Sequence, residues 1–141
     1  MLGKKYCIGV KMVEAWPEER DGTPGCAIRY PDGYVSWSPL DVFEKAYFEL
    51  ADETGTKITQ FDVNRFMYEI DAKQIDEKTT LVKCVTQSGF VQYESSSCVD
   101  PKNYGHEIGT LCGLKRIEDS IWKLLGFTLQ WAKDGLKGEW R

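Results

Sequence analysis

The last third of the chain carries a helical pattern that limits what the whole sequence can fold into. Asp100-Pro101 is typical of a helix start, with a capping carboxylate followed by a proline in the first turn. Beyond it, the helical pattern continues to about Leu136. One straight helix of that length would extend about 50 Å, which is more than the small domain that it covers. We therefore expect a break, either within Gly105–Gly113 or at Gly126.

An apolar stripe at helical spacing runs along this C-terminal region. The residues expected to face the core are Leu111, Leu114, Ile117 or Glu118, Ile121, Leu125, Thr128 and Ala132. The stripe is widened by Trp122, Leu124, Phe127, Leu129 and Trp131 beyond what one sheet usually covers. We interpret this excess as a surface for oligomerisation or for a partner. The alternative is a helix that passes between two lobes and is buried all round.

Three glycines at four-residue spacing, Gly105, Gly109 and Gly113, share one helical face. Such a face lets another backbone approach closely. Together with Trp122, Phe127 and Trp131, these glycines form the oligomer interface that we predict for a homo-oligomer. The alternative is that the glycine face packs within the chain, on the second β-hairpin.

The first 50 residues predict an antiparallel meander followed by a helix. The strands are expected at Tyr6–Ala15, Ala27–Tyr30 and Tyr34–Trp37, from their alternation and from the Pro31-Asp32-Gly33 turn. Ser38 as N-cap, Pro39 at the first helical position and Asp41 in the first turn then predict a helix from Leu40 to about Leu50.

Residues 51–58 form a polar linker that contains Gly55, and we expect a hinge there. Thr59 and Asp62 then make a capping box for a helix over Gln60–Ile70. Asp71–Lys78 reads as a charged loop, and Thr79–Thr86 with Phe90–Ser95 as a hairpin.

The predicted fold class is α+β, with two small antiparallel strand–strand–helix units plus a long C-terminal amphipathic helix. The expected boundaries are 1–50, a linker at 51–58, and 59–141. Asp32–Trp37 and Ser88–Tyr93 each precede a capped helix start. This is a weak internal repeat or the ordinary chemistry of a hairpin followed by a helix.

Composition excludes several classes of function. The 141 residues carry a net charge of −4 with mixed signs, so neither DNA mimicry nor non-specific nucleic-acid binding is expected. No stretch is long enough to cross a bilayer, and no apolar leader follows Met1, so we expect a soluble cytoplasmic protein. The five cysteines are then free thiols, and most simply small buried hydrophobes: Cys7, Cys26, Cys84, Cys98 and Cys112.

Catalytic chemistry has little support in the sequence. Cys98, Asp100 and His106 could form a nucleophile–base–orienter set, which leaves a cysteine-dependent enzyme as a remote alternative. The favoured interpretation is a strand-end cysteine, an N-cap aspartate and a solvated histidine. No phosphate loop and no metal-ligand spacing is present, so we predict no catalytic residue, no metal and no cofactor.

A set of cationic and aromatic residues is the candidate ligand or partner site. Arginine among aromatic rings can stack on and clamp a nucleotide-like anion, although strand alternation alone accounts for the same residues. The set consists of Arg29, Tyr34, Trp37, Tyr104, His106, Lys115 and Arg116.

Two stretches resemble known phage proteins. Tyr30–Pro39 followed by Asp41–Tyr47 is similar to a module of small tailed-phage proteins, and Glu94–Tyr104 with Ile121–Phe127 is similar to an accessory protein family of coliphages and lambdoid phages. The chain departs from the family pattern at Gly105 and Gly113, where ordinary helix formers are expected.

The resemblance implies an accessory protein of unknown function that acts in an infected bacterium. We expect a non-enzymatic protein that binds and antagonises a host factor, such as a bacterial defence component. The alternative is an oligomeric binding protein that sequesters a nucleotide-type immune signal.

Overall fold

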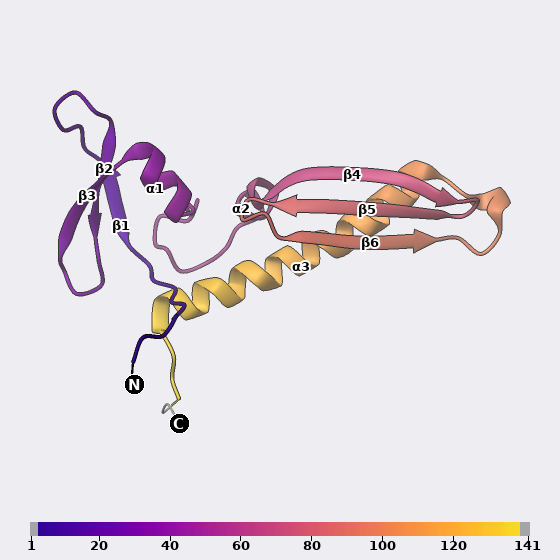
Figure 1. Cartoon of the computed structure of the whole chain (residues 1–141). Helices are drawn as coiled ribbons and strands as arrows, with labels where there is room; N and C mark the ends of the chain where they lie inside the picture. The colour runs from indigo at the N-terminus through magenta and orange to yellow at the C-terminus, as the bar shows by residue number, and fades with distance from the viewer. Residues whose placement is uncertain (1–2, 139–141) are drawn as a thin grey trace. The chain divides into compact units, whose positions relative to one another are not determined.

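The computed structural model describes residues 3–138 and has an α+β fold, as the sequence predicts. The described residues form two three-stranded antiparallel sheets and three α-helices (Figure 1). The elements are β1 (Glu14–Pro17), β2 (Gly25–Arg29), β3 (Val35–Pro39), α1 (Leu40–Ala46), α2 (Gln60–Phe66), β4 (Met67–Asp76), β5 (Thr79–Thr86), β6 (Val91–Ser97), the 3₁₀ turn η1 (Pro101–Asn103) and α3 (His106–Asp134).

The chain divides into two compact units. Among the described residues, the first contains residues 3–49 and 127–138, and the second contains residues 50–126. The predicted linker 51–58 therefore belongs to the second unit, and α3 contributes residues to both.

The first unit is built on the sheet order β1–β2–β3, with α1 packed against β2 and β3. Ala27 at the centre of β2 lies opposite Trp16 of β1 and Trp37 of β3. The Trp37 ring lies directly over Gly25, where a Cβ atom would collide with it. Gly25 is therefore needed so that this indole can close over the central strand.

The first strand is much shorter than predicted. Only Glu14 and Ala15 of the predicted Tyr6–Ala15 strand belong to β1, which continues through Pro17. Tyr6 and Ile8 are instead fully or almost fully exposed. Because β2 offers only five residues for pairing, the alternating segment before Glu14 has no neighbouring strand to support it.

The first helix also departs from its predicted caps. α1 ends at Ala46 and not near Leu50, and its N-cap is Pro39, without a side-chain hydrogen bond. Ser38 belongs to β3, where its hydroxyl donates to the carbonyl oxygen of Pro39. Strand β3 thus continues directly into α1. Ser38, which was predicted to cap the helix, is instead a residue of β3 that pairs with Cys26 of β2.

The capping box at α2 is confirmed. The Thr59 hydroxyl accepts from the Asp62 N–H, and the Asp62 carboxylate accepts from the Thr59 N–H at 2.9 Å. Burial alone would raise the pKa of Asp62, but hydrogen bonds from Thr59, Ala51 and Arg65 outweigh it and hold that pKa below its ordinary value. This buried carboxylate ties the backbone of Ala51 to α2.

The rest of the predicted linker is ordered by a second aspartate. Asp52 accepts hydrogen bonds from the Thr54 hydroxyl and from the backbone and hydroxyl of Thr56, which lower its pKa to about 2. Two carboxylates therefore fix both ends of residues 51–56 by hydrogen bonds. The unit boundary lies just before this segment, between residues 49 and 50, and the hinge stays a prediction.

The predicted loop Asp71–Lys78 is wrong, because most of it is strand. α2 ends at Phe66 and β4 follows at once, pairing with β5 from Met67 to Asp76. β5 matches its predicted bounds Thr79–Thr86, and β6 lies on its other side (Figure 1). The second sheet therefore has three strands where the sequence suggested a hairpin.

Helix α3 covers one face of this second sheet through two glycines. Gly109 lies against Thr80, and a Cβ atom on Gly113 would come within 2.6 Å of a Val82 methyl group. Further along, Ile117, Ile121 and Leu125 complete the buried stripe of the helix. They form the core with Val63, Val82 and Cys84. Burial raises the pKa of the Cys84 thiol.

The predicted break lies at the first glycine of the expected range, Gly105, and neither Gly109, Gly113 nor Gly126 interrupts the helix. η1 ends at Asn103, Tyr104 and Gly105 intervene, and α3 then runs without interruption from His106 to Asp134. Asp100 caps η1 by accepting from the Lys102 N–H, so the predicted helix start there is a single 3₁₀ turn. Gly109 and Gly113 do not break α3, because their contacts with β5 offset the low helix propensity of glycine.

Two glycine substitutions in α3 test this packing. Gly113→Ala is expected to lower the free energy of unfolding by about 1–3 kcal/mol, because the added methyl group overpacks against Val82. Gly126→Ala is the matched control, since no atom lies within 4 Å of its added Cβ. It is expected to raise stability by up to about 1 kcal/mol through helix propensity. Urea denaturation of both variants measures the difference, and equal effects would contradict the packing described.

Candidate functional site

The sheet of the second unit has one covered face and one uncovered face. Along β5, Thr80, Val82, Cys84 and Thr86 are buried, whereas Leu81, Lys83 and Val85 are half-buried. The two glycine contacts place α3 on the side of Thr80 and Val82. The other side, which we call the open face, carries Glu69, Asp71, Lys73, Leu81, Lys83, Val85, Val91 and Tyr93.

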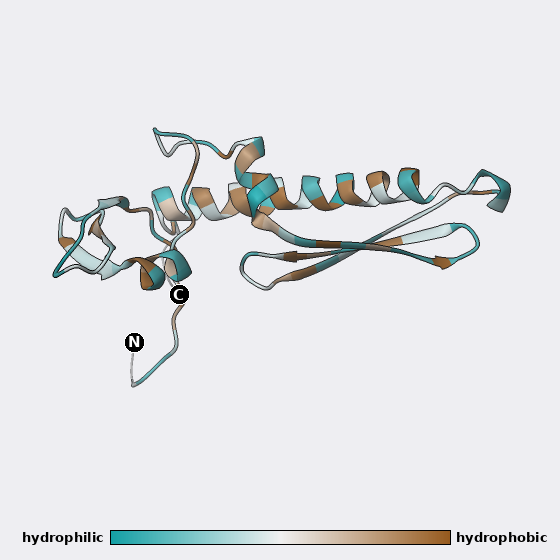
Figure 2. Cartoon of the chain, turned by 90° about the horizontal axis from the view of Figure 1, so that it is seen from above, coloured by the Kyte–Doolittle hydropathy of each residue, from teal (hydrophilic) through white to brown (hydrophobic). Residues whose placement is uncertain are grey.

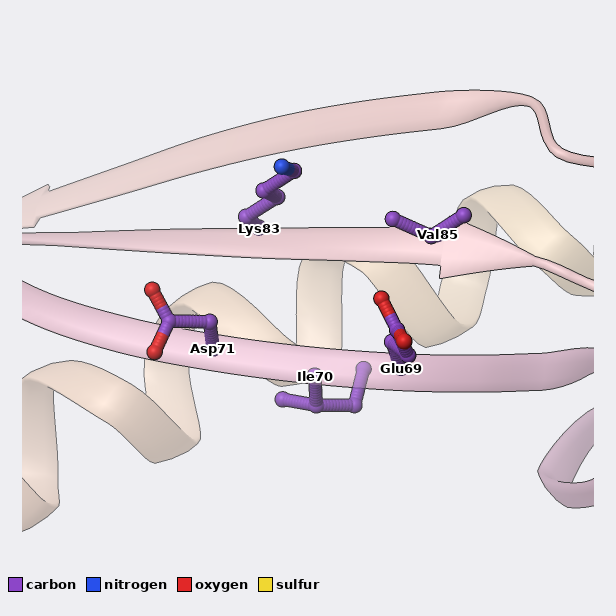
Figure 3. A pocket seen from close by; sticks show the side chains of 5 residues that line it. All are labelled: Glu69, Ile70, Asp71, Lys83 and Val85. Carbon is purple, nitrogen blue, oxygen red and sulfur yellow. The ribbon is translucent and has the colours of Figure 1, made fainter.

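Two hollows lie on the open face. The larger, of about 390 Å³, is lined by Glu69, Ile70, Asp71, Lys83 and Val85. Figure 3 shows Glu69, Lys83 and Val85 pointing to one side of the sheet and Ile70 to the other. The smaller, of about 150 Å³, continues over Asp71, Lys73, Leu81, Lys83 and Tyr93. Asp71 and Lys83 line both, so they mark the middle of the face.

The open face combines balanced charge with an aromatic ring. Lys83 lies opposite Asp71 on β4 and opposite Tyr93 on β6, with its ammonium 6.0 Å from the centre of the Tyr93 ring. Glu69 and Asp71 bring two negative charges, and Lys73 and Lys83 bring two positive ones. Such a mixture of both signs is suited to a partner surface of complementary charge and not to a polyanion.

The predicted site residues of the first unit have partners within that unit. The Arg29 guanidinium lies 5.1 Å from the centre of the Trp16 ring and 3.5 Å from the Glu14 carboxylate. The Trp37 indole N–H donates to the Glu18 carbonyl oxygen at 2.7 Å. Tyr34 is exposed, and its ring stacks on Tyr30.

The predicted site residues of the second unit also have partners within their own unit. The Tyr104 hydroxyl shares hydrogen bonds with Thr80 Oγ1 at 2.8 Å and with His106 Nδ1 at 3.2 Å. Lys115 pairs with Asp119 at 3.0 Å, and hydrogen bonding to that carboxylate raises the Lys115 pKa. Arg116 donates to the Ser95 carbonyl oxygen. The predicted set is therefore divided between two units, and each member takes part in local structure.

The residues predicted for an oligomer interface have three different roles. Gly109 and Gly113 are buried against β5, so their assignment to a subunit interface is corrected to an intrachain contact. Trp122 packs against the core of the second unit. Phe127 is 65% exposed and meets Trp131 edge to face. Gly105 precedes α3 and its Cβ position meets only Ile108, at ordinary contact distance.

The predicted nucleophile–base–orienter set does not form a hydrogen-bonded chain. The Cys98 thiol donates to the backbone oxygen of Asp100, and His106 bonds to Tyr104. Of the five free thiols, Cys26 and Cys84 are buried, whereas Cys7 and Cys112 are exposed. The expectation that all five are buried hydrophobes is therefore wrong.

Within residues 3–138, no three side chains of the metal-ligating types lie together. The same residues include no helix with the length and apolar character needed to cross a membrane.

Sequence reasoning missed the open face because it missed β4. The segment from Glu69 to Lys73 alternates polar and apolar residues, which is the period of a strand. The preceding capping box and the density of charges favoured a helix followed by a loop. The alternation was the available signal, and it identifies Glu69, Asp71 and Lys73 as one face.

Comparison with known proteins places this region in a family. The phage protein (N4 Gp49/phage Sf6 gene 66) family matches residues 41–132, more than half of the chain, including all of the open face. No curated protein and no solved structure matches the chain.

Tyr104 can be tested as a structural residue. Tyr104→Phe is expected to lower the free energy of unfolding by about 1–3 kcal/mol, because it deprives the buried Thr80 hydroxyl of its partner. Tyr34→Phe removes the same atom from an exposed ring and is expected to change stability by less than about 0.5 kcal/mol. Thermal or urea unfolding compares the stability of the two variants. If Tyr104→Phe leaves the free energy of unfolding unchanged, Tyr104 has no structural role and remains a candidate ligand contact.

Proposed function

The chain belongs to the phage protein (N4 Gp49/phage Sf6 gene 66) family, and we propose that it is a non-enzymatic accessory protein that binds a host protein and antagonises it. The proposed binding surface is the open face of the β4–β5–β6 sheet. The proposed place of action is the cytoplasm of the infected bacterium, with a component of bacterial defence as the target.

One observation carries this proposal: the second sheet leaves a whole face uncovered by any element of its own unit. Tyr93 and Val91 on that face are 55% and 43% exposed. Exposed aromatic and aliphatic groups with polar groups at their border resemble the apolar centre and polar rim of a protein interface, where tyrosine is a frequent contributor to binding energy. The face also lies inside the region that matches the family.

The character of the open face favours a protein over a small molecule. Small-ligand sites bury most of the ligand in a cavity with convergent polar groups. Here the hollows lie on the surface of a sheet, and their charged side chains stand in a row along it. The two negative charges of Glu69 and Asp71 beside the two positive charges of Lys73 and Lys83 match a folded partner with a complementary arrangement of charges.

Photo-crosslinking inside infected cells tests the proposal. Benzoylphenylalanine at position 71 lies at the middle of the open face, and the same residue at position 123 lies on an exposed turn of α3. We expect position 71 to crosslink to one host protein and position 123 not to. Lys83→Glu, which makes the centre of the face acidic, is expected to remove that crosslink without changing the thermal midpoint.

Equal crosslinking of the same host protein from both positions would contradict the assignment to the open face. So would a crosslink from position 71 that survives Lys83→Glu unchanged. If no host protein is crosslinked to position 71 while the chain is expressed at its normal level, the proposal is wrong.

A further inference from the structure

The outer edge of β6 is a regular row of backbone groups that pair with no other strand of the described residues. The bonds Thr86 N–H to Phe90 O and Cys98 N–H to Lys78 O fix which residues of β6 face β5. By the two-residue alternation of an antiparallel ladder, Gln92, Glu94 and Ser96 pair with β5. The backbone groups of Val91, Tyr93, Ser95 and Ser97 therefore point away from the sheet.

The described residues leave this edge almost uncovered. The N–H groups of Val91, Tyr93, Ser95 and Ser97 meet no acceptor among residues 3–138, and the carbonyl of Ser95 receives one hydrogen bond, from Arg116. The opposite edge, β4, differs because two register shifts interrupt its pairing with β5. Bulges of this kind protect an edge against further strand addition, and β6 has none.

We propose that a second copy of the chain pairs along this edge, β6 antiparallel to β6, with Tyr93 opposite Tyr93 on the two-fold axis. This places Val91 opposite Ser95 of the other copy and Gln92 opposite Glu94. The second copy is favoured over an unrelated strand because β6 is complementary to itself in this register.

The side chains select the register. Centring the pair on Glu94 would place two carboxylates directly opposite each other, which destabilises an antiparallel pair. Centring it on Tyr93 instead places an amide opposite the carboxylate and brings two tyrosine rings together, and both of these pairs stabilise a sheet. The Tyr93-centred register pairs residues 91–95 of the seven-residue strand with the copy, whereas the Glu94-centred register would pair all seven residues but would bring the two carboxylates together.

The pairing has a consequence for the open face. Residues directly opposite each other in a sheet point to the same side. The two open faces would therefore join across the axis into one surface with two copies of the Lys83–Tyr93 pair. A partner with two equivalent sites would gain affinity from such a surface without any new contact.

Proline substitution on the two edges tests the interface. We expect the wild-type chain to have twice its mass of 16.1 kDa in light scattering at micromolar to submillimolar concentration. Ser95→Pro removes an outward N–H and no intrachain bond, so it is expected to give a folded monomer. Gln74→Pro makes the same change on the β4 edge and is expected to stay dimeric.

A wild-type monomer throughout this range would overturn the proposal, as would a Ser95→Pro protein that remains dimeric. Dissociation by Gln74→Pro to the same extent would also overturn it, because the effect would not belong to β6. Tyr93→Glu is a second variant that does not depend on proline being tolerated, since the Tyr93 side chain is exposed. It is expected to give a monomer through like charges at the axis.

Disulfide trapping tests the register. Opposite residues in a hydrogen-bonded pair have Cα atoms about 5.5 Å apart, within the range that a disulfide spans. Tyr93→Cys is therefore expected to crosslink two chains through position 93 under mild oxidation, and Ser95→Cys is not, because its opposite residue is Val91. Peptide mapping assigns the bond, and crosslinking through position 95 alone would overturn the register.

Discussion

The close approach of α3 to β5 is the contact on which the second unit depends. Gly109 and Gly113 have no side chain, so the helix backbone lies directly against Thr80 and Val82. This contact fixes which face of the three-stranded sheet is covered and aligns Ile117 and Ile121 with Cys84 and Val63 in the core. Figure 2 shows hydrophobic and hydrophilic segments alternating along α3, as expected for a helix that buries a single stripe.

The uncovered face follows from the same geometry. One helix can cover one side of a sheet of this width, and the other side is left to solvent or to a partner. Its residues are neither a plain solvated surface nor a second core, because Tyr93 and Val91 stand beside charges of both signs. The proposals for this face and for the β6 edge are independent: a host protein can bind one open face, and two faces can join without any host protein.

Local chemistry predicted some elements well. The Thr59–Asp62 capping box marked the start of α2, and the alternation in Thr79–Thr86 marked β5, because both signals are complete within a few residues. The Tyr6–Ala15 alternation was equally clear but had no partner strand, and pairing is a property of the whole fold. Gly109 and Gly113 were wrongly predicted to break α3, because the packing of the helix on β5 at these two positions stabilises it and is not visible in the sequence.

The candidate site was the least predictable part. The cationic and aromatic residues chosen from the sequence are held by neighbours such as Trp16, Thr80 and Asp119, which no sequence spacing indicates. The open face arises from three strands that come together only in the folded chain, and one of them, β4, was predicted as the end of a helix followed by a loop. The alternation in the sequence identified the residues of the open face on β5 and β6. The residues on β4 were identified only from the pairing of β4 with β5 in the structure.

Thiol labelling at position 91 tests the central claim most directly. In a Val91→Cys protein, which keeps the charged side chains of the open face, native Cys112 on α3 is an exposed internal reference and Cys84 a buried one. Site-resolved mass spectrometry after maleimide treatment compares the purified protein with the same protein inside infected bacteria. We predict that position 91 is labelled in the purified protein and is protected relative to Cys112 in the cell. An unchanged ratio between the two sites would contradict the proposed binding surface.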